Sequence, residues 1–349
     1  MSKSIYTKIN KKKNSPYFIA EIGINHNGSF DLAKKMIIAA KNSGADCVKF
    51  QSLKADKYIS SLAQKAPYQN NETKFKNKTQ LQIIRDCEIS INEMVKLKNF
   101  CNKIKIDFLS TPFEIDSFKE LIKIGVKTIK VSSCNLTNLP FLKEVSKYNV
   151  DVLLSTGMAS LDEVLNSYKI LNDKNLNVGV FQCTSNYPCK FENVNLNVLK
   201  VYRTIFGNPV GFSDHTFGTL PAIVAATMGV DMIEKHFTLS RELPGVDQKA
   251  SIEPKELKNL IIDLKQIKKI QGSQIKKIVD EEFDTKLSLR RSLVAKKNLN
   301  KGELIKKNDI AIKRPGTGIE PKYFDFIVGK KIGTNVIKDE ILTMDKFIL

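Results

Sequence analysis

The sequence has no long apolar run and no closely paired cysteines. No segment of the 349 residues approaches the roughly 20 consecutive apolar residues that a membrane-spanning helix requires. The six cysteines are scattered without C-x-x-C spacing, which does not favour a zinc site or a disulfide framework. The first residues are rich in lysine and asparagine and lack the apolar core of a secretory signal. We therefore expect a soluble, cytoplasmic protein with no membrane partner.

Arginine is scarce, although the chain is strongly basic. The formal net charge is +19, and almost all of the excess comes from lysines spread along the whole chain. Proteins that read bases and phosphates favour arginine, whose planar group binds two acceptors at once. Scattered lysine is more typical of a solvated surface, so the composition does not favour nucleic acid as a partner. The charge can still steer a small anionic substrate.

Short β-branched runs alternate with amphipathic helical stretches, which predicts a parallel sheet covered by helices. Eight such runs, each followed by a loop or helix, fit a (β/α)8 TIM barrel better than an open doubly wound sheet. The predicted strands are residues 17–22, 46–51, 106–110, 128–132, 151–155, 177–183, 209–213 and 231–235.

Two segments depart from this alternation. Residues 58–77 are polar and have no clear period, which predicts a lid or binding loop after the second strand. Beyond about residue 276 the rhythm stops, and predicted strands at 288–295 and 308–313 form a short separate module. We therefore predict a TIM-barrel catalytic domain over residues 1–275, a linker at 276–288, and a small β-rich domain at 289–349.

The carboxyl ends of the strands line the active site of a TIM barrel, so the residues there indicate the chemistry. Lys49 and Lys130 lie in the second and fourth predicted strands, and hydroxyl side chains end several others. Taken singly, each lysine is more often a surface charge. Their repeated placement at one end of the barrel favours an anion pocket that suits phosphoenolpyruvate (PEP), which carries a phosphate and a carboxylate.

Histidine is rare, and two of the three residues, His215 and His236, end adjacent predicted strands. Imidazoles placed in this way can bind a divalent metal ion and leave positions open for substrate and water. A structural role fits their spacing equally well. His26 stands between two asparagines in a loop, and its position favours a role in organising that turn.

A series of motifs follows in order along the chain. They are Ala20-Glu-Ile-Gly-Ile-Asn-His-Asn-Gly28, Val48-Lys-Phe-Gln51, Ser110-Thr-Pro-Phe113, Lys130 with Ser132-Ser133, Leu154-Ser-Thr-Gly-Met158, Cys183-Thr-Ser-Asn-Tyr-Pro188, Gly211-Phe-Ser-Asp-His-Thr216, Ile233-Glu-Lys-His-Phe-Thr238 and Gly245-Val-Asp247. Together they resemble the sialic acid synthase family over nearly the whole chain. The module with Arg314-Pro-Gly-Thr-Gly318 resembles the antifreeze-like (SAF) domain of these synthases.

The resemblance implies a transferase that forms a carbon–carbon bond. It condenses PEP with N-acetylmannosamine, or a related N-acetylated amino sugar, and water to give N-acetylneuraminate and phosphate. A divalent metal, usually manganese but also magnesium or cobalt, is implied at His215 and His236. A homodimer with swapped SAF domains is also implied, in which Arg314 reaches the sugar of the partner subunit.

The resemblance also implies roles for the remaining site residues. PEP binding is implied for Lys49, Thr111, Lys130, Ser133, Ser155 and Ser213. Sugar binding is implied for Gln51, Tyr187, Asp247 and Arg314. Glu21 and Glu234 are the candidate acid–base groups, and the sequence leaves open which of them activates water.

The sequence does not decide which sugar is the substrate. Gln182 and Gln248 stand where many relatives carry histidine, and we expect both near the sugar pocket. N-acetylmannosamine is the first expectation, and 2,4-diacetamido-2,4,6-trideoxymannose, the substrate of a legionaminate synthase, is the second. The sequence also leaves room for a sugar 6-phosphate as substrate, for a different PEP-condensing aldolase, and for a non-catalytic basic barrel that binds nucleic acid or protein.

Overall fold

The computed structural model describes residues 4–65, 77–207 and 209–348. The chain divides into two compact units, Met1–Gly272 and Ser273–Leu349. No helix in these described ranges is both long enough and apolar enough to cross a membrane.

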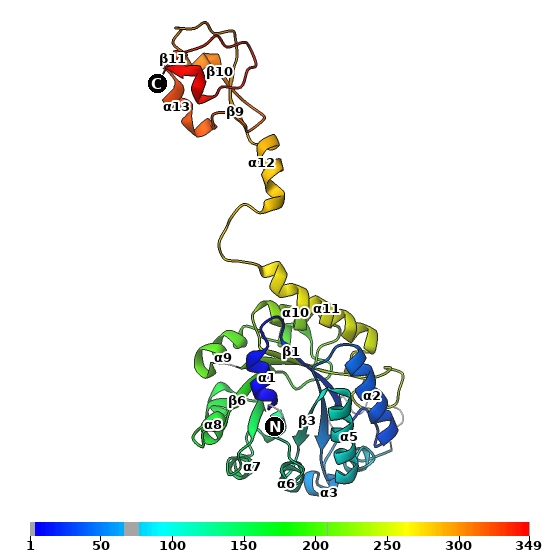
Figure 1. The fold of residues 1–349 in the computed structure, drawn as a ribbon. Helices are drawn as coiled ribbons and strands as arrows, with labels where there is room; N and C mark the ends of the chain where they lie inside the picture. Colours follow the sequence, from blue (N-terminus) through cyan, green and yellow to red (C-terminus); the bar gives the residue numbers. More distant parts are fainter. Residues whose placement is uncertain (1–3, 66–76, 208, 349) are drawn as a thin grey trace. The chain divides into compact units, whose positions relative to one another are not determined.

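The first unit is built around eight parallel strands, which confirms the predicted barrel (Figure 1). Hydrogen-bonded neighbours follow the order β3-β2-β1-β8-β7-β6-β5-β4. β3 and β4 contact one another without a ladder in the described residues, so the barrel is nearly closed. The strands are β1 Tyr17–Gly23, β2 Cys47–Ser52, β3 Asp107–Pro112, β4 Thr128–Val131, β5 Asp151–Ser155, β6 Val178–Cys183, β7 Val210–Asp214 and β8 Met232–His236.

Helices surround the barrel because their apolar residues recur every three or four positions and face the strands. One large core fills the layer between strands and helices, with Val48, Leu97, Val131 and Leu142 among its fully buried members. The helices of this layer are α2 Phe30–Asn42, α5 Ile91–Ile104, α6 Ile115–Lys123, α7 Leu139–Val145, α8 Leu161–Asn172, α9 Val198–Phe206, α10 Leu220–Thr227 and α11 Pro254–Gln271.

A short helix, α1 (Ile5–Lys11), covers the amino end of the barrel. Ile5 and Ile9 enter a small core with barrel residues that include Leu109 and Phe181. The Ile5 amide also donates to the Thr128 hydroxyl at 3.2 Å. Apolar side chains therefore fill the barrel interior at this end, which leaves the carboxyl end for a site.

The connection after β2 carries two further short helices, α3 (Ala55–Tyr58) and α4 (Gln80–Arg85). They flank the lid or binding loop predicted at 58–77, of which residues 66–76 lie outside the described residues. A capping box between Thr79 and Gln82 fixes the start of α4.

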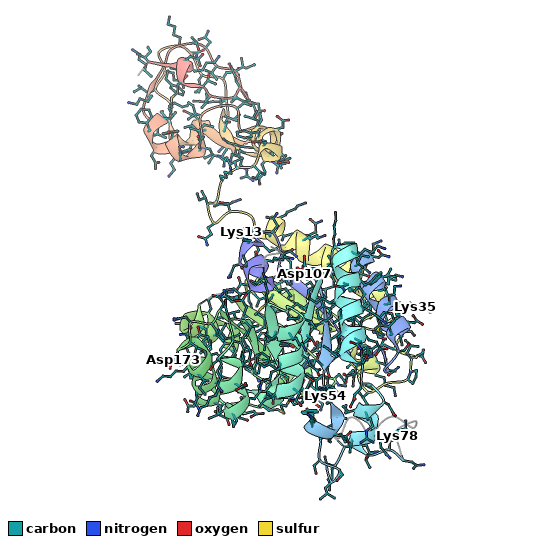
Figure 2. The ribbon with its side chains drawn as sticks, turned by 60° about the horizontal axis from the view of Figure 1, so that its bottom comes forward. Lys13, Lys35, Lys54, Lys78, Asp107 and Asp173 are labelled. Atoms are coloured by element: carbon teal, nitrogen blue, oxygen red, sulfur yellow. The ribbon has the colours of Figure 1, made fainter. Side chains whose placement is uncertain are left out.

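Surface lysines are dispersed over the barrel unit. Lys13, Lys35, Lys54 and Lys78 lie on separate parts of it (Figure 2). Some are paired with acids, as Lys54 is with Glu120 and Lys78 with Asp86. This dispersal matches the interpretation of scattered lysine as a solvated surface.

The second unit has its own small core, which includes Leu293, Ile305 and Leu342. Two antiparallel pairs of strands form it, β9 (Ser292–Ala295) with β10 (Ile310–Lys313) and β11 (Lys331–Ile332) with β12 (Phe347–Ile348). The short helix α13 (Phe324–Ile327) lies between β10 and β11. The predicted linker contains a helix, α12 (Phe283–Leu289), so the first strand begins later than predicted.

Candidate active site

A cavity of about 570 Å³ lies at the carboxyl ends of the barrel strands. Side chains alternate along a strand, so Ser213 and His215 line it while Asp214 between them does not, and Glu234 and His236 line it while Lys235 does not. The predicted site residues of the barrel all line this cavity. They are Glu21, Lys49, Gln51, Thr111, Lys130, Ser133, Ser155, Tyr187, Ser213, His215, Glu234, His236 and Asp247.

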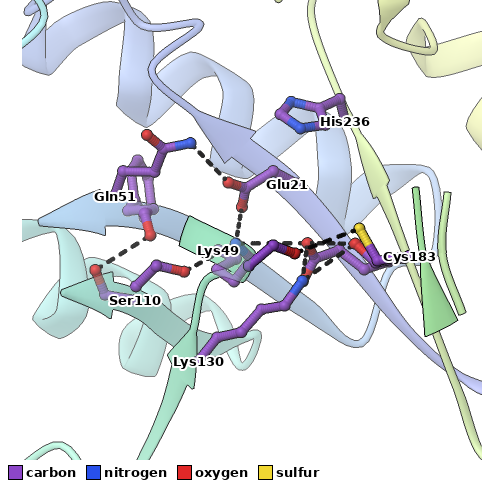
Figure 3. A network of polar contacts seen from close by, with 12 residues as sticks. Glu21, Lys49, Gln51, Ser110, Lys130, Cys183 and His236 are labelled. Atoms are coloured by element: carbon purple, nitrogen blue, oxygen red, sulfur yellow. Dashed lines mark hydrogen bonds and ion pairs between the residues drawn. The ribbon is translucent and has the colours of Figure 1, made fainter. Parts of the chain in front are cut away.

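Lys49, Lys130, Glu21 and Glu234 line the cavity together, and we call this group its floor. Figure 3 labels Glu21, Lys49 and Lys130 and draws their polar contacts as dashed lines. The Lys49 Nζ lies 3.0 Å from Glu21 Oε2 and 3.5 Å from Glu234 Oε1, and the Lys130 Nζ lies 2.6 Å from the same Glu234 oxygen. No side chain in this group is more than 5% exposed. Unpaired charges at this depth would be strongly destabilising, so each lysine needs its carboxylate when no substrate is present.

Hydroxyl groups complete the floor. Lys49 donates to the Thr111 hydroxyl at 3.0 Å, and Lys130 donates to the Ser213 hydroxyl at 3.1 Å. Ser213 in turn donates to Glu234 at 3.3 Å, and the Gln51 amide donates to Glu21 at 3.3 Å. The network thus joins strands β1, β2, β3, β4, β7 and β8 through side chains that face the cavity.

Glycine at position 157 allows a close approach beside the floor. Its amide donates to the Ser133 hydroxyl at 2.9 Å. A Cβ at this position would lie 2.2 Å from the Ser185 hydroxyl oxygen and 2.9 Å from that of Ser133. Any larger residue would therefore displace hydroxyl groups that line the cavity.

Burial and neighbouring charges raise the pKa values of some carboxyl groups in the cavity and lower that of another. Burial raises the pKa of Glu21, although Lys49 opposes this effect. Burial alone would also raise the pKa of Glu234, but the charges of Lys130 and Lys49 outweigh it and the pKa is lowered. For Asp247, burial together with the charge of Glu21 raises the pKa to about 7.

His215 and His236 lie side by side with ring centroids 5.4 Å apart. The His215 Nδ1 donates to the Thr184 carbonyl at 2.9 Å, which leaves Nε2 as the free nitrogen. Burial and the neighbouring His215 hold the pKa of His236 well below its usual value, so that ring is neutral. Within the part of the chain that the structure describes, the buried His236 Nδ1 has no hydrogen-bond partner, and it lies 3.8 Å from Asp247 Oδ2.

These two imidazoles fit a divalent ion that takes its other ligands from substrate and water. Among the described residues, no group of three or more His, Cys, Asp or Glu side chains is arranged to hold a metal. An ion at this place would therefore have two protein ligands and several open positions, as a Lewis acid that contacts its substrate requires.

A further buried ion pair lies next to the two histidines in the sequence, on the other face of β7 and β8. Lys235 Nζ lies 2.8 Å from Asp214 Oδ2, and both side chains are fully buried on the side of the strands away from the cavity. Lys235 also donates to the Thr216 carbonyl at 2.8 Å. Asp214 is thus used to join the ends of β7 and β8 and does not face the cavity.

Two glutamines expected near the pocket, Gln182 and Gln248, stand next to the lining residues Cys183 and Asp247. Neither Gln182 nor Gln248 lines the cavity. Gln182 points outward from β6 and donates to the Val194 carbonyl at 3.0 Å, whereas Gln248 donates to the Asn25 carbonyl at 2.8 Å. Both side chains are therefore hydrogen-bonded to backbone carbonyls beside the cavity.

Sequence reasoning missed several lining residues. Cys183 lies 3.7 Å from the His215 Nδ1, and Cys134 is exposed beside Tyr58. Burial would raise the pKa of Cys183, but His215 and Lys130 outweigh it and lower the pKa to about 6. Cys134 lies just after β4 and Cys183 ends β6, and these positions at the carboxyl ends of strands could have identified both as lining residues. Arg314 belongs to the second unit, where it is exposed, and its role stays a prediction.

Family models and curated proteins match most of this chain. The model of the NeuB family matches residues 36–276, and that of the SAF domain matches residues 290–348. The N,N'-diacetyllegionaminic acid synthase of Campylobacter jejuni is 42% identical over 327 residues, which cover 93% of this chain and 98% of that protein. The N,N'-diacetyllegionaminic acid synthase of Legionella pneumophila is 39% identical, and the match covers 92% of this chain and 91% of that protein.

A solved structure of a sialic acid synthetase is also similar to this chain. The N-acetylneuraminic acid (sialic acid) synthetase of Leptospira borgpetersenii, in complex with citrate, has a TM-score of 0.69 at 30% identity. The match covers 78% of this chain and 90% of that one. The resemblance inferred from the motifs is confirmed, and the chain belongs to the NeuB family and carries a SAF domain.

Proposed function

We propose that this protein condenses PEP with an N-acetylated amino-sugar aldehyde and water to give a nine-carbon 2-keto acid and phosphate. The observation that carries this assignment is the cavity floor, where two buried lysines and two buried glutamates meet several hydroxyl groups. Membership of the NeuB family supports the same chemistry. A non-catalytic barrel has no reason to keep four charges buried in a cavity.

PEP binds to the lysines and hydroxyls of the floor. Lys49 and Lys130 neutralise its carboxylate and phosphate, and both are already desolvated and held in position by their glutamates. Fixed donors in such a dry site stabilise charge far better than they do in water. The hydroxyl groups that orient the substrate are those of Thr111, Ser133, Ser155 and Ser213.

The reaction forms one carbon–carbon bond and breaks one carbon–oxygen bond. C3 of PEP attacks the aldehyde carbon, the aldehyde oxygen takes a proton to become a hydroxyl, and a cationic centre is left at C2. Water adds to C2, and the tetrahedral adduct loses phosphate. Glu21 and Glu234 are the carboxylates that move protons in these steps, and the lysines stabilise the phosphate as it leaves.

A divalent ion, manganese as first expectation, would be held by His215 and His236 and would polarise the aldehyde oxygen. His236→Ala is expected to lose manganese binding, measured by electron paramagnetic resonance, together with turnover. His26→Asn is the matched control, because His26 does not line the cavity. If His236→Ala still binds manganese as tightly as wild type, the metal assignment is wrong.

The sugar lies above PEP, near Gln51, Tyr187 and Asp247. N-acetylmannosamine is the substrate expected first from the motifs. The names of the Campylobacter and Legionella relatives favour 2,4-diacetamido-2,4,6-trideoxymannose as the second candidate.

Phosphate release from PEP tests the reaction class. It is measured with manganese and with N-acetylmannosamine, its 6-phosphate or 2,4-diacetamido-2,4,6-trideoxymannose, each with and without chelator. The expected result is chelator-sensitive release that requires one of the unphosphorylated sugars. If no sugar drives release, the proposed function is wrong even though the fold stands.

Arg314 completes the site from a second copy of the chain. Its exposed position in the SAF domain of a NeuB-family protein supports this role. Arg314→Ala is expected to lose most activity without unfolding. Mixed dimers of Arg314→Ala with His236→Ala subunits should regain one working site, because one barrel then meets an intact Arg314. Properly mixed dimers that stay inactive would argue against a shared site.

A further inference from the structure

Three buried polar side chains join the loop after β1 to the segment between β8 and α11, beside the cavity. They are Asn25 in the loop, and Gln248 and Ser251 in the segment. Each is at most 2% exposed, and none of the three lines the cavity. We call this group the loop clamp. Its members are too deeply buried to touch a substrate, so any part in the reaction must be exerted through the residues that they hold.

Chemistry fixes the direction of the hydrogen bonds in the loop clamp. The Asn25 Nδ2 lies 2.9 Å from the Phe237 carbonyl oxygen and 2.9 Å from the Ser251 hydroxyl oxygen. A carbonyl can only accept, so the amide nitrogen must face it and donate. The Ser251 hydroxyl then accepts the second amide proton and donates its own to the Asp247 carbonyl at 2.7 Å. One side-chain amide therefore holds two backbone carbonyls, that of Phe237 directly and that of Asp247 through Ser251.

Further hydrogen bonds close the loop clamp. The Gln248 side-chain amide donates to the Asn25 carbonyl at 2.8 Å, and its oxygen accepts from the Thr238 hydroxyl. The Ile252 amide donates to the His236 carbonyl at 2.9 Å. The end of β8 and the turn around Gln248 are thus tied to each other and to the loop after β1.

The two carbonyls that Asn25 holds belong to the backbone beside two lining side chains. Phe237 directly follows His236 in the chain, and Asp247 lines the cavity itself. The His236 Nδ1 and the Asp247 Oδ2 are 3.8 Å apart, and both side chains are buried. An imidazole that binds a metal through Nε2 carries a proton on Nδ1, and a carboxylate beside that proton orients the ring. The separation of these two backbone points therefore decides how His236 presents Nε2.

We infer that Asn25 is a positioning residue for the metal-binding side of the active site. Through the loop clamp it holds the end of β8 and the turn of Asp247 at one separation, so that the Asp247 carboxylate orients the His236 ring. The inference rests on the proposed function, which places the divalent ion at His215 and His236. A clamp with a structural role alone would affect stability without a specific effect on metal affinity, and this difference can be measured.

Asn25→Ala and Ser251→Ala test the loop clamp in the full chain. Manganese affinity, measured by electron paramagnetic resonance, should weaken roughly 10-fold to 100-fold in Asn25→Ala, the range for lost outer partners of metal ligands. Ser251→Ala should weaken it less, because Asn25 still holds the Phe237 carbonyl. Binding of PEP in the absence of metal, measured by calorimetry, should stay at the wild-type value in both variants, since no lysine of the floor is hydrogen-bonded to the clamp.

Ser167→Ala is the matched control. Ser167 is 1% exposed, donates to the Leu136 carbonyl at 2.6 Å and does not line the cavity. It should lose a similar buried hydrogen bond and keep wild-type manganese affinity. An equal loss of manganese affinity in Ser167→Ala would overturn the assignment, and so would wild-type affinity in folded Asn25→Ala. If Asn25→Ala does not fold, Ser251→Ala decides the question, and wild-type affinity in that variant overturns the assignment.

The double variant Asn25→Ala/Ser251→Ala tests whether the two side chains act as one unit. Its loss of manganese affinity should be smaller than the product of the two single losses, because both belong to one chain of hydrogen bonds. Losses that multiply would overturn the loop clamp as a unit. Absence of manganese binding in the wild-type protein would instead reject the metal assignment of the proposed function, and the role of Asn25 with it.

Discussion

Both ends of the barrel carry lysine–carboxylate pairs, but the pairs differ in burial. At the amino end, Lys8 pairs with Asp107 and Lys12 with Asp46, and these side chains are between 23% and 36% exposed. At the carboxyl end, the pairs of Lys49 and Lys130 with glutamate are at most 5% exposed.

This difference in burial indicates different roles for the ion pairs at the two ends of the barrel. Exposed pairs contribute about 0–1 kcal/mol and cost little to form. Buried pairs seldom stabilise a protein more than apolar residues of the same volume would. The amino-end pairs therefore join the α1 segment to the barrel, whereas the carboxyl-end pairs are explained by the proposed function, in which their charges bind the substrate.

Lys130→Met should have the largest effect. It removes a donor to the departing phosphate and leaves Glu234 with only the more distant Lys49. We expect kcat/KM to fall roughly 10²-fold to 10³-fold. The free energy of unfolding should fall by about 3–5 kcal/mol, because a buried carboxylate loses its near partner. Phosphate release and urea unfolding measure the two effects.

The double variant Lys130→Met/Glu234→Met is the control for that loss. It removes both charges together, so stability should return close to the wild-type value while activity stays lost. A double variant as unstable as Lys130→Met would mean that the buried pair stabilises the fold, and the contrast between the two ends would fail.

Lys235→Met tests a buried pair that does not face the cavity. It leaves Asp214 charged and unpaired behind β7 and β8, so the free energy of unfolding should fall by about 3–5 kcal/mol. Manganese affinity should weaken roughly 10-fold, because the pair fixes the strand ends that carry His215 and His236. Binding of PEP in the absence of metal, measured by calorimetry, should change little, since the pair does not touch the lysines of the floor. A large loss of PEP affinity in folded protein would contradict the view that the Lys235–Asp214 pair acts only on the metal-binding side of the site.

The barrel and the inward-facing site residues could be predicted from the sequence. The strands are short, mostly buried runs with polar residues in or just after their last positions, and β5 was predicted at its observed bounds of 151–155. Alternation along a strand then places Lys49 and Gln51 on one face. The position of a strand and the face on which each side chain lies depend on short stretches of sequence, so they could be predicted without the fold.

Pairings across the barrel could not be predicted. Lys130 meets Glu234 from the opposite part of the sheet, 104 positions away in the sequence, and only closure of the strands brings them together. The outward direction of Gln182, which donates to the Val194 carbonyl, follows from the register of β6 in the folded sheet and was not predicted from its position before Cys183.

Ile9→Val sharpens the comparison at the amino end. Ile9 is 1% exposed, does not line the cavity, and belongs to one buried cluster with Phe181, whose ring centre lies 4.6 Å from the Lys130 Nζ. Loss of one methylene should lower the free energy of unfolding by about 1 kcal/mol. kcat and KM should both stay at wild-type values, because this end of the barrel has a structural role. A clear change in kcat would show that packing at the amino end is coupled to the site.

Lys12→Gln should have the smallest effect. Lys12 pairs with Asp46 and its ammonium group lies 5.8 Å from the centre of the Tyr17 ring, but a quarter of its side chain is exposed. The expected loss of stability is about 0–1 kcal/mol, and it should shrink further at high salt because solvent ions screen an exposed pair. The matched measurement on Lys130→Met should keep most of its loss at high salt, since salt screens the Glu234 side chain, only 3% exposed, much less than a surface group. Equal salt dependence in the two variants would remove the distinction between the ends of the barrel.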